Sequence, residues 1–122
     1  VGHFDLIRLH DPDYRQTLGV PHVWERVLRN LALVKEMGCV LDINARALLK
    51  GQPEPYVSAS VLYEAVRLGI PLAYGDDAHG VRDVGCRYGE VADIVLAVGG
   101  RLWDFTSFAD CRAARDVARP AT

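Results

Sequence analysis

The sequence predicts an α/β fold in which helices cover a sheet of parallel strands. Short apolar runs alternate three to four times with segments whose apolar residues recur at helical spacing, as in strands joined by helices. The connections between them are of moderate length, and no internal repeat or low-complexity tract interrupts the pattern. Periodicity alone leaves two architectures possible, an open sheet and a closed barrel.

The first half of the chain is expected to hold two strands and one helix. Residues 3–9 are an apolar run of β-compatible residues without a helix breaker, which predicts a strand. Residues 10–22 contain prolines, aspartates and a glycine and are expected to form a loop. Residues 23–38 place apolar side chains on one stripe and follow a proline, which predicts a helix that a glycine ends. The second strand is expected at residues 39–44.

The second half repeats the alternation. A loop rich in glycine and proline leads to a predicted helix at residues 59–68, with Ser58 or Ser60 as its cap and a glycine as its stop. Residues 70–75 are the third predicted strand, and the polar loop "DDAHGVRDVG" follows it. The remaining expected elements are a helix, a short strand and a final polar helix, at residues 87–98, 101–105 and 109–118.

Composition indicates one globular domain or part of one. Half of the 122 residues are hydrophobic and a quarter are charged, close to the balance of ordinary soluble proteins. The formal net charge of -2 provides no basic surface, so we expect no nucleic-acid partner. No apolar run approaches the ~20 residues that cross a bilayer, and the chain does not open like a signal peptide. We therefore expect a cytoplasmic protein with no membrane partner.

Two further features concern cysteines and the start of the chain. The three cysteines are widely spaced and form neither a metal motif nor a disulfide framework, so free thiols are expected. The sequence opens without a methionine and already within a predicted strand. We therefore expect the chain to be part of a longer protein.

Polar side chains form pairs at positions i and i+2 on three of the predicted strands, so each pair shares one face. Two pairs lie at the carboxyl end of their strand, the edge where parallel α/β folds bind ligands. Imidazole and carboxylate together suit Zn, Mn or Fe, which favours a metal site. Alternatively, the histidines are hydrogen-bonded core groups and the aspartates cap the following segments. The pairs are His3 with Asp5, Asp42 with Asn44, and Asp77 with His79.

Three stretches resemble the PHP family, and within it the histidinol-phosphatases: "VGHFDLIR", "LDINARALLKGQPEPY" and "GIPLAYGDDAHGVRDVG". Their order and spacing agree with that family from residue 1 to about residue 105. The resemblance implies a distorted (β/α)7 barrel with a cluster of divalent metal ions at the carboxyl ends of its strands. It also implies hydrolysis of L-histidinol phosphate to L-histidinol and phosphate, a late step of histidine biosynthesis.

The resemblance assigns roles to particular residues. The family's Gly-His-x-Asp motif falls on residues 2–5, which makes His3 a metal ligand. Its later Asp-x-His motif falls on Asp77 and His79, which are expected to bind metal and to form the catalytic pair. Three further residues are expected to hold these ligands in place without binding the metal themselves: Asp5, Asp42 and Asn44.

The sequence also departs from the family pattern. Family members begin with a strand that carries His-x-His and further ligands, whereas the four histidines here contain no such motif. We therefore expect residues 1–122 to be a partial PHP domain, its carboxyl-terminal half. The amino-terminal half of the barrel and most metal ligands are expected to be absent, so that the metal cluster is incomplete.

In the complete family protein, a water activated by the metals attacks phosphorus while basic side chains hold the phosphate. The candidates for that role here are Arg8, Arg46 and Lys50. The expected partner is therefore a small-molecule phosphate ester.

Two alternatives remain open. A PHP enzyme of this type could hydrolyse a different phosphoester. The chain could also be an inactive metal-binding half-barrel that associates with itself through exposed strand edges and helix faces.

Overall fold

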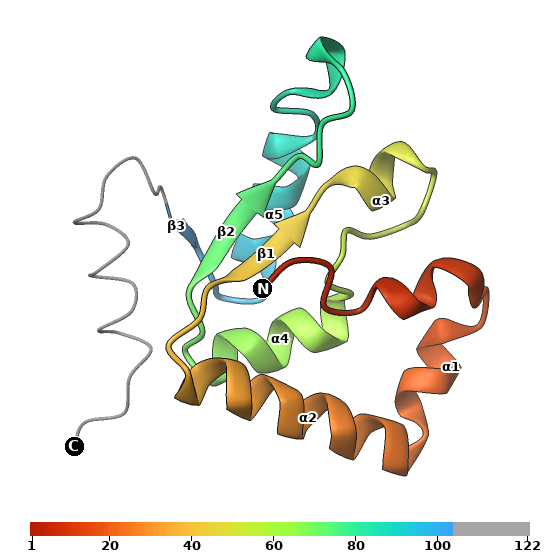
Figure 1. The fold of residues 1–122 in the computed structure, drawn as a ribbon, viewed down its shortest axis with the longest axis vertical. Helices are drawn as coiled ribbons and strands as arrows, with labels where there is room; N and C mark the ends of the chain where they lie inside the picture. The colour runs from red at the N-terminus through yellow and green to blue at the C-terminus, as the bar shows by residue number, and fades with distance from the viewer. Residues whose placement is uncertain (104–122) are drawn as a thin grey trace.

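A computed structural model of the chain describes residues 1–103 (Figure 1). The helix expected at residues 109–118 and the end of the strand expected at 101–105 lie outside the described residues. The strands are β1 (Leu41–Asn44), β2 (Leu72–Gly75) and β3 (Leu102–Trp103). They pair in parallel in the order β1-β2-β3. The predicted α/β fold with parallel strands is confirmed, and the sheet of residues 1–103 is open rather than closed into a barrel.

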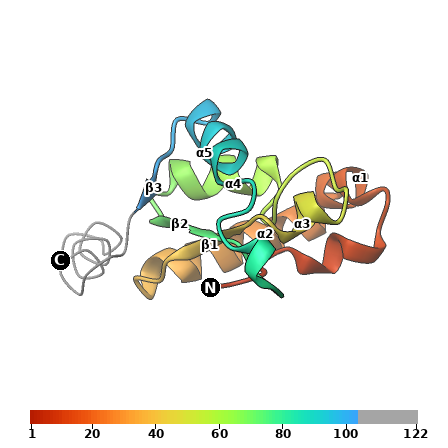
Figure 2. The ribbon, with the colours of Figure 1, turned by 90° about the horizontal axis from the view of Figure 1, so that it is seen from above.

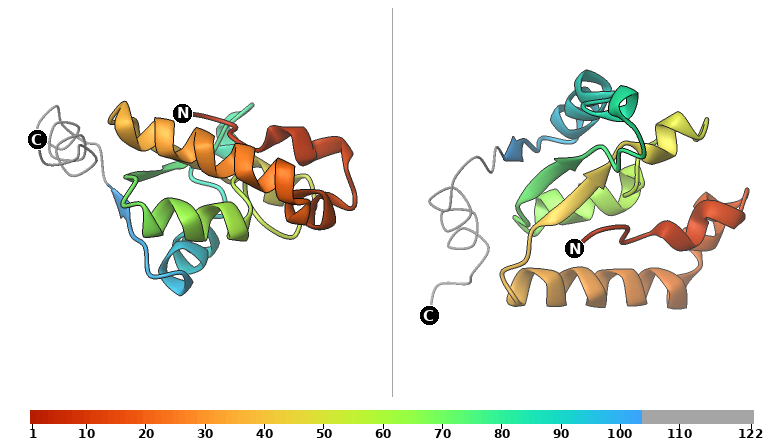
Figure 3. Two further views of the ribbon diagram at one scale, coloured as in Figure 1. Left: turned by 90° about the horizontal axis from the view of Figure 1, so that it is seen from below. Right: turned by 45° about the horizontal axis from the view of Figure 1, so that its top comes forward.

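Five α-helices and two short 3-10 helices flank the strands in residues 1–103. The α-helices are α1 (Tyr14–Gly19), α2 (Pro21–Glu36), α3 (Arg46–Leu49), α4 (Ala59–Arg67) and α5 (Tyr88–Ala97), and the 3-10 helices are η1 (Leu6–His10) and η2 (Val81–Asp83). Figure 2 shows α4 and α5 together on one side of the strands, and Figure 3 shows α2 beside α4. None of these helices is long and apolar enough to cross a membrane.

The three long helices begin and end close to where the sequence predicts. Pro21 occupies the first turn of α2, where its missing N–H costs nothing. Gly38 and Gly69 follow α2 and α4 with φ of 65° and 70°, a conformation that glycine adopts without strain. Ser58 precedes α4 as expected, but its hydroxyl caps nothing.

The strand expected at residues 3–9 is wrong. The chain starts beside β1, where the Val1 carbonyl accepts a hydrogen bond from the Asp42 N–H at 2.9 Å. His3 then adopts a φ of 54° and turns the chain away, and η1 follows. The expected loop at 10–22 is also partly wrong, because it contains α1. An apolar run of this length fits a helical turn as well as a strand, and breakers can flank a helix as short as α1.

The two faces of the sheet differ in chemistry. Successive strand residues point to opposite faces, so Leu41 and Ile43 share one face and Asp42 and Asn44 share the other. Leu41 and Ile43 are fully buried in the hydrophobic core, which valine, leucine and alanine side chains of α4 and α5 complete. The polar pair is therefore presented on the opposite face, at the edge where β1 and β2 end.

Candidate metal centre at the carboxyl edge of the sheet

Three side chains from distant parts of the chain meet where β1 and β2 end. His3 Nε2 lies 3.1 Å from Asp77 Oδ2, and the Asn44 amide nitrogen lies 3.3 Å from the same imidazole nitrogen. Asn44 Nδ2 also lies 3.5 Å from Asp77 Oδ2. The parallel register brings Asn44 opposite Gly75, immediately before the loop that carries Asp77. Sheet topology thus assembles this cluster from an N-terminal segment and two strand ends.

The orientation of the Asn44 amide is fixed by its other end. The backbone N–H of Arg46 donates a 2.8 Å hydrogen bond to Asn44 Oδ1, and only the oxygen of the amide accepts. The NH2 group must therefore face the cluster, where it also reaches Asp42 Oδ2 at 3.4 Å. Asn44 thus supplies a donor to both carboxylates.

His79 extends the cluster along the loop that follows β2. Its Nε2 lies 3.3 Å from Asp77 Oδ1, so Asp77 turns one oxygen toward each imidazole. On the other side of the ring, Arg46 Nη2 lies 3.2 Å from His79 Nδ1. The Asp83 carboxylate accepts a 2.8 Å bond from Arg46 Nη1 and a 3.1 Å bond from the His79 N–H.

Strained backbone occurs at two of these residues. His3 and Asp77 have φ of 54° and 51°, in the left-handed region that residues other than glycine seldom adopt. Such conformations cost energy and gather at binding and catalytic sites, because the surrounding contacts must hold them. The side chains of these two residues contact each other, at 3.1 Å.

The carboxylates of the cluster differ in their electrostatics. Burial alone raises the pKa of Asp77, but hydrogen bonds from His3 and Asn44 and the nearby imidazoles outweigh it, so this pKa lies below its ordinary value. The pKa of Asp42 is raised, because burial outweighs the hydrogen bond from Asn44. The cluster therefore holds Asp77 as an anion beside two imidazoles, an environment that suits a cation.

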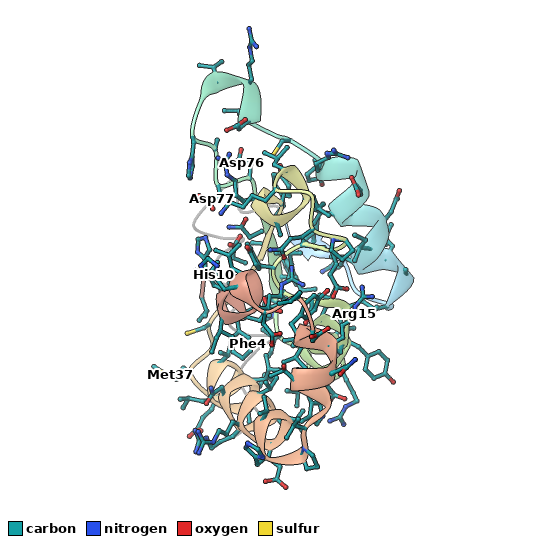
Figure 4. All side chains as sticks on the ribbon, turned by 90° about the vertical axis from the view of Figure 1, so that its right-hand side faces the viewer. Phe4, His10, Arg15, Met37, Asp76 and Asp77 are labelled. Atoms are coloured by element: carbon teal, nitrogen blue, oxygen red, sulfur yellow. The ribbon has the colours of Figure 1, made fainter. Side chains whose placement is uncertain are left out.

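Asp76 holds the loop that carries Asp77 and His79. Its carboxylate accepts hydrogen bonds from the Ala78 N–H at 3.2 Å and from the Gly85 N–H at 2.9 Å, which closes the loop on itself. Figure 4 places Asp76 and Asp77 together at the base of this projecting loop, far from Met37, which follows α2. Apart from its place in the Asp-Asp doublet, no local pattern singles out Asp76.

Arg8 and Asp5 lie in the interior instead of at the cluster. Arg8 is buried, with its guanidinium between the rings of Tyr14 and Tyr56 at 4.9 and 4.8 Å. It donates hydrogen bonds to the Glu54 and Pro55 carbonyls at 2.8 and 2.6 Å. Asp5 accepts a 2.6 Å bond from the Ser58 N–H at the start of α4. We therefore leave Arg8 out of the candidate site.

Lys50 lies exposed at the end of α3, and no hydrogen bond or ion pair joins it to the cluster in residues 1–103. Its expected role in binding phosphate stays a prediction. Of the three basic candidates, the structure brings only Arg46 to the cluster.

Two residues that the sequence did not single out hold neighbouring groups in place: Glu54 in the interior and Asp83 beside the cluster. Glu54 is buried and receives hydrogen bonds from Tyr14 and Arg8 on one oxygen and from the Ala59 N–H on the other. Asp83 joins Arg46 to the His79 backbone. The partners Arg8 and Tyr14 of Glu54 lie 40 or more residues away in the chain, and Asp83 lies in an irregular loop. No local sequence pattern therefore predicts the role of either residue.

The donor set fits a divalent cation in part. Imidazole nitrogens and carboxylate oxygens meet in two pairs that share Asp77, and these are ligand types that Zn, Mn and Fe accept. Within residues 1–103, no three His, Cys, Asp or Glu side chains are grouped closely enough to bind one ion together. The described residues therefore offer part of a coordination sphere.

Fold and cluster together define the class: an α/β protein with imidazole and carboxylate groups at the carboxyl edge of a parallel sheet. Histidinol-phosphatase of Saccharomyces cerevisiae is 31% identical over 120 aligned positions, covering 80% of this chain and 36% of the yeast protein. Proteins described as "Probable histidinol-phosphatase" from Schizosaccharomyces pombe and Deinococcus radiodurans are 34% and 30% identical, covering 72% and 86% of this chain. No protein-family model and no solved structure matches the chain.

This chain is a distant homologue of the histidinol-phosphatases. It spans 29–38% of the length of the three relatives, so it corresponds to about a third of such a protein.

Proposed function

We propose that the chain is the carboxyl-terminal part of a PHP-type histidinol-phosphatase domain, which hydrolyses L-histidinol phosphate to L-histidinol and phosphate. The observation that carries the proposal is the meeting of His3, Asp77 and His79 at the carboxyl edge of the sheet. Homology to histidinol-phosphatases over most of the chain supports the choice of substrate.

His3, Asp77 and His79 are the residues that would hold a divalent ion, with Zn, Mn and Fe as the metals their chemistry suits. When bound, such an ion supplies a nucleophile from water at neutral pH and neutralises charge on phosphoryl oxygens. Since these three side chains form two pairs sharing one carboxylate, further ligands must complete the sphere. In this chain alone water and the phosphate group supply them, and in a protein as long as the relatives the remainder supplies protein ligands as well.

The residues of this chain have separate tasks in the proposed reaction. Asp77 orients both imidazoles, one with each carboxylate oxygen. Asn44 holds Asp42 and Asp77 in place through its amide. Arg46 lies beside His79 and presents a planar guanidinium, whose donors match phosphoryl oxygens in pairs.

The test is phosphate release from L-histidinol phosphate by the full chain in the presence of Mn2+ or Zn2+, with a second phosphomonoester for comparison. We expect release to require metal and to fall to background in His79→Ala. His22→Ala changes an exposed histidine at the start of α2 and should leave the rate unchanged. Equal release from both esters would leave phosphatase chemistry but contradict the substrate. No release by a chain that binds metal would mean that this part alone is inactive.

A second candidate follows from exposed apolar side chains. Ile7 on η1 is 89% exposed, and Leu33 on α2 and Met37, which follows α2, are more than half exposed. We propose that these side chains contact another copy of the chain, since an apolar patch on the surface favours association. A molecular mass in solution that rises with concentration would support this candidate, and a constant monomer mass would contradict it.

A further inference from the structure

One face of α2 is exposed and carries both apolar and charged side chains. Its exposed residues recur at intervals of three or four, so they form a single stripe along the helix. This α2 stripe consists of Arg26, Asn30, Leu33 and Met37. Met37 directly follows the helix in helical backbone conformation, and Leu33 and Met37 are 52% and 64% exposed. Figure 1 shows α2 along the lower edge of the molecule, where the stripe is open to solvent in residues 1–103.

A groove of about 330 Å³ lies between η1 and α2, beside the first half of the α2 stripe. Arg26 and Asn30 of the stripe border it, and apolar side chains form most of its lining. Those apolar residues are Phe4, Ile7, Leu18, Val23 and Val27. The α2 stripe thus has an apolar groove near one end and an exposed apolar side chain, Met37, at the other.

Two opposite charges flank the α2 stripe on one side. Arg29 and Glu36 are seven residues apart, about two helical turns, so they lie on the same flank, while Val27 lies on the other. Both charged side chains are exposed, and neither takes part in a hydrogen bond or ion pair within residues 1–103. Each charge is therefore available to a second molecule.

The two charges favour one orientation of a second copy. When two identical helices pack antiparallel across a two-fold axis, each flank faces the same flank of the other copy. Arg29 of each copy then meets Glu36 of the other, at two symmetric places. In a parallel pair the charged flank would face the flank of Val27, and neither charge would be paired. The antiparallel arrangement also aligns the two helix dipoles favourably.

We propose that a second copy of the chain packs antiparallel against α2. Arg29 and Glu36 lie on either side of Leu33 in the sequence, so Leu33 lies near the two-fold axis. The end of one α2 then lies beside the first half of the other, which brings Met37 to the groove of the other copy. The inference rests on the second candidate above, association of the chain with itself, and specifies its surface and orientation. A single helix pair is a small interface, so we expect weak association.

Sedimentation equilibrium of the full chain over a range of concentrations tests this pairing. Arg29→Glu and Glu36→Arg alone each set like charges opposite one another at two symmetric places, so each should weaken association at least about ten-fold. The double variant exchanges the two charges and should restore association close to that of the wild type. Thermal unfolding of each variant checks that it folds.

Met37→Lys tests the apolar contact and should also weaken association about ten-fold, because it places a charge in an apolar groove. Leu96→Lys on α5 is the matched control, since Leu96 is 62% exposed and lies outside the proposed interface. The control should associate like the wild type.

Association that the single charge variants weaken and the double variant restores supports the pairing. A double variant that associates no better than the single ones overturns the antiparallel pairing and leaves association through another surface. A constant monomer mass of the wild type overturns the pairing together with the second candidate. None of these results depends on metal binding or phosphate release, so the proposed phosphatase activity is judged separately.

Discussion

The carboxylate of Asp42 occupies the space that a side chain on Gly75 would fill. A Cβ at Gly75 would lie 2.0 Å from Asp42 Oδ1 and 2.9 Å from its carboxyl carbon. Asp42 sits on β1, and Gly75 ends the neighbouring strand β2. The absence of a side chain at Gly75 therefore decides where this carboxylate lies.

Gly75→Ala is expected to displace Asp42 and to lower the free energy of unfolding by about 1–3 kcal/mol, the usual cost of overpacking. Urea denaturation measures this change. The cost should shrink when Gly75→Ala is combined with Asp42→Ala, because the double variant removes the clashing oxygen. Gly89→Ala, where a Cβ meets nothing within 4 Å, is the matched control. An equal cost of Gly75→Ala in both backgrounds would contradict this explanation.

Glu54→Ala is expected to lower the free energy of unfolding by about 3–5 kcal/mol, because it removes the nearer of the two carboxylates that face the buried Arg8 guanidinium and also the acceptor of the Tyr14 hydroxyl. Glu64→Ala removes a carboxylate from an ion pair with the exposed Arg67 and should cost no more than about 1 kcal/mol. Chemical denaturation of both variants compares them. Similar losses in the two would argue against a special role for the interior network.

Asn44→Asp is expected to destabilise the fold by about 1–3 kcal/mol, because it replaces the donor shared by Asp42 and Asp77 with a third carboxylate. Asn30→Asp on the exposed surface of α2 introduces the same chemical change without such neighbours. Thermal unfolding at neutral pH tests both. A loss no larger than that of Asn30→Asp would mean that Asn44 does not hold the two carboxylates.

Stability is expected to fall as the pH rises above about 10. Burial raises the pKa of Tyr14 in the folded chain, and the Glu54 carboxylate raises it further. A group whose folded pKa exceeds its unfolded pKa stabilises the protein below the unfolded value, and that stabilisation is lost as the pH rises through the folded pKa. Tyr14→Phe should therefore flatten the fall in the free energy of unfolding as the pH rises above about 10. An unchanged slope would contradict this assignment.

Local patterns were sufficient for the larger elements of the fold. Helices α2, α4 and α5 show helical spacing with glycine or proline near their ends, and β1 and β2 are apolar runs between them. The same pattern wrongly predicted a strand at residues 3–9. There Val1 hydrogen-bonds to β1, and His3 then turns the chain away from the sheet. Short elements such as η1 take their structure from tertiary contacts rather than from their own pattern.

The candidate site was only partly accessible from sequence. Parallel strand ends lie at one edge, so Asn44 and Asp77 could be expected to approach each other, and the structure brings them within 3.5 Å. His3 and Asp5 were expected to share one face of a strand at residues 3–9, and the chain forms no strand there. Arg8 could not be placed, because its partners Glu54 and Pro55 lie 46 and 47 residues away.

Mn2+ titration of the full chain and of Asp77→Asn tests most directly whether Asp77 joins two imidazoles in a metal site. Asparagine keeps the shape of the side chain and tolerates the left-handed backbone, so the variant removes mainly the charge. Asp93→Asn on the exposed face of α5 is the control. We predict that the wild type and the control bind Mn2+ and that Asp77→Asn binds it at least about ten-fold more weakly. Equal affinities in all three proteins, or no binding by the wild type, would contradict the account.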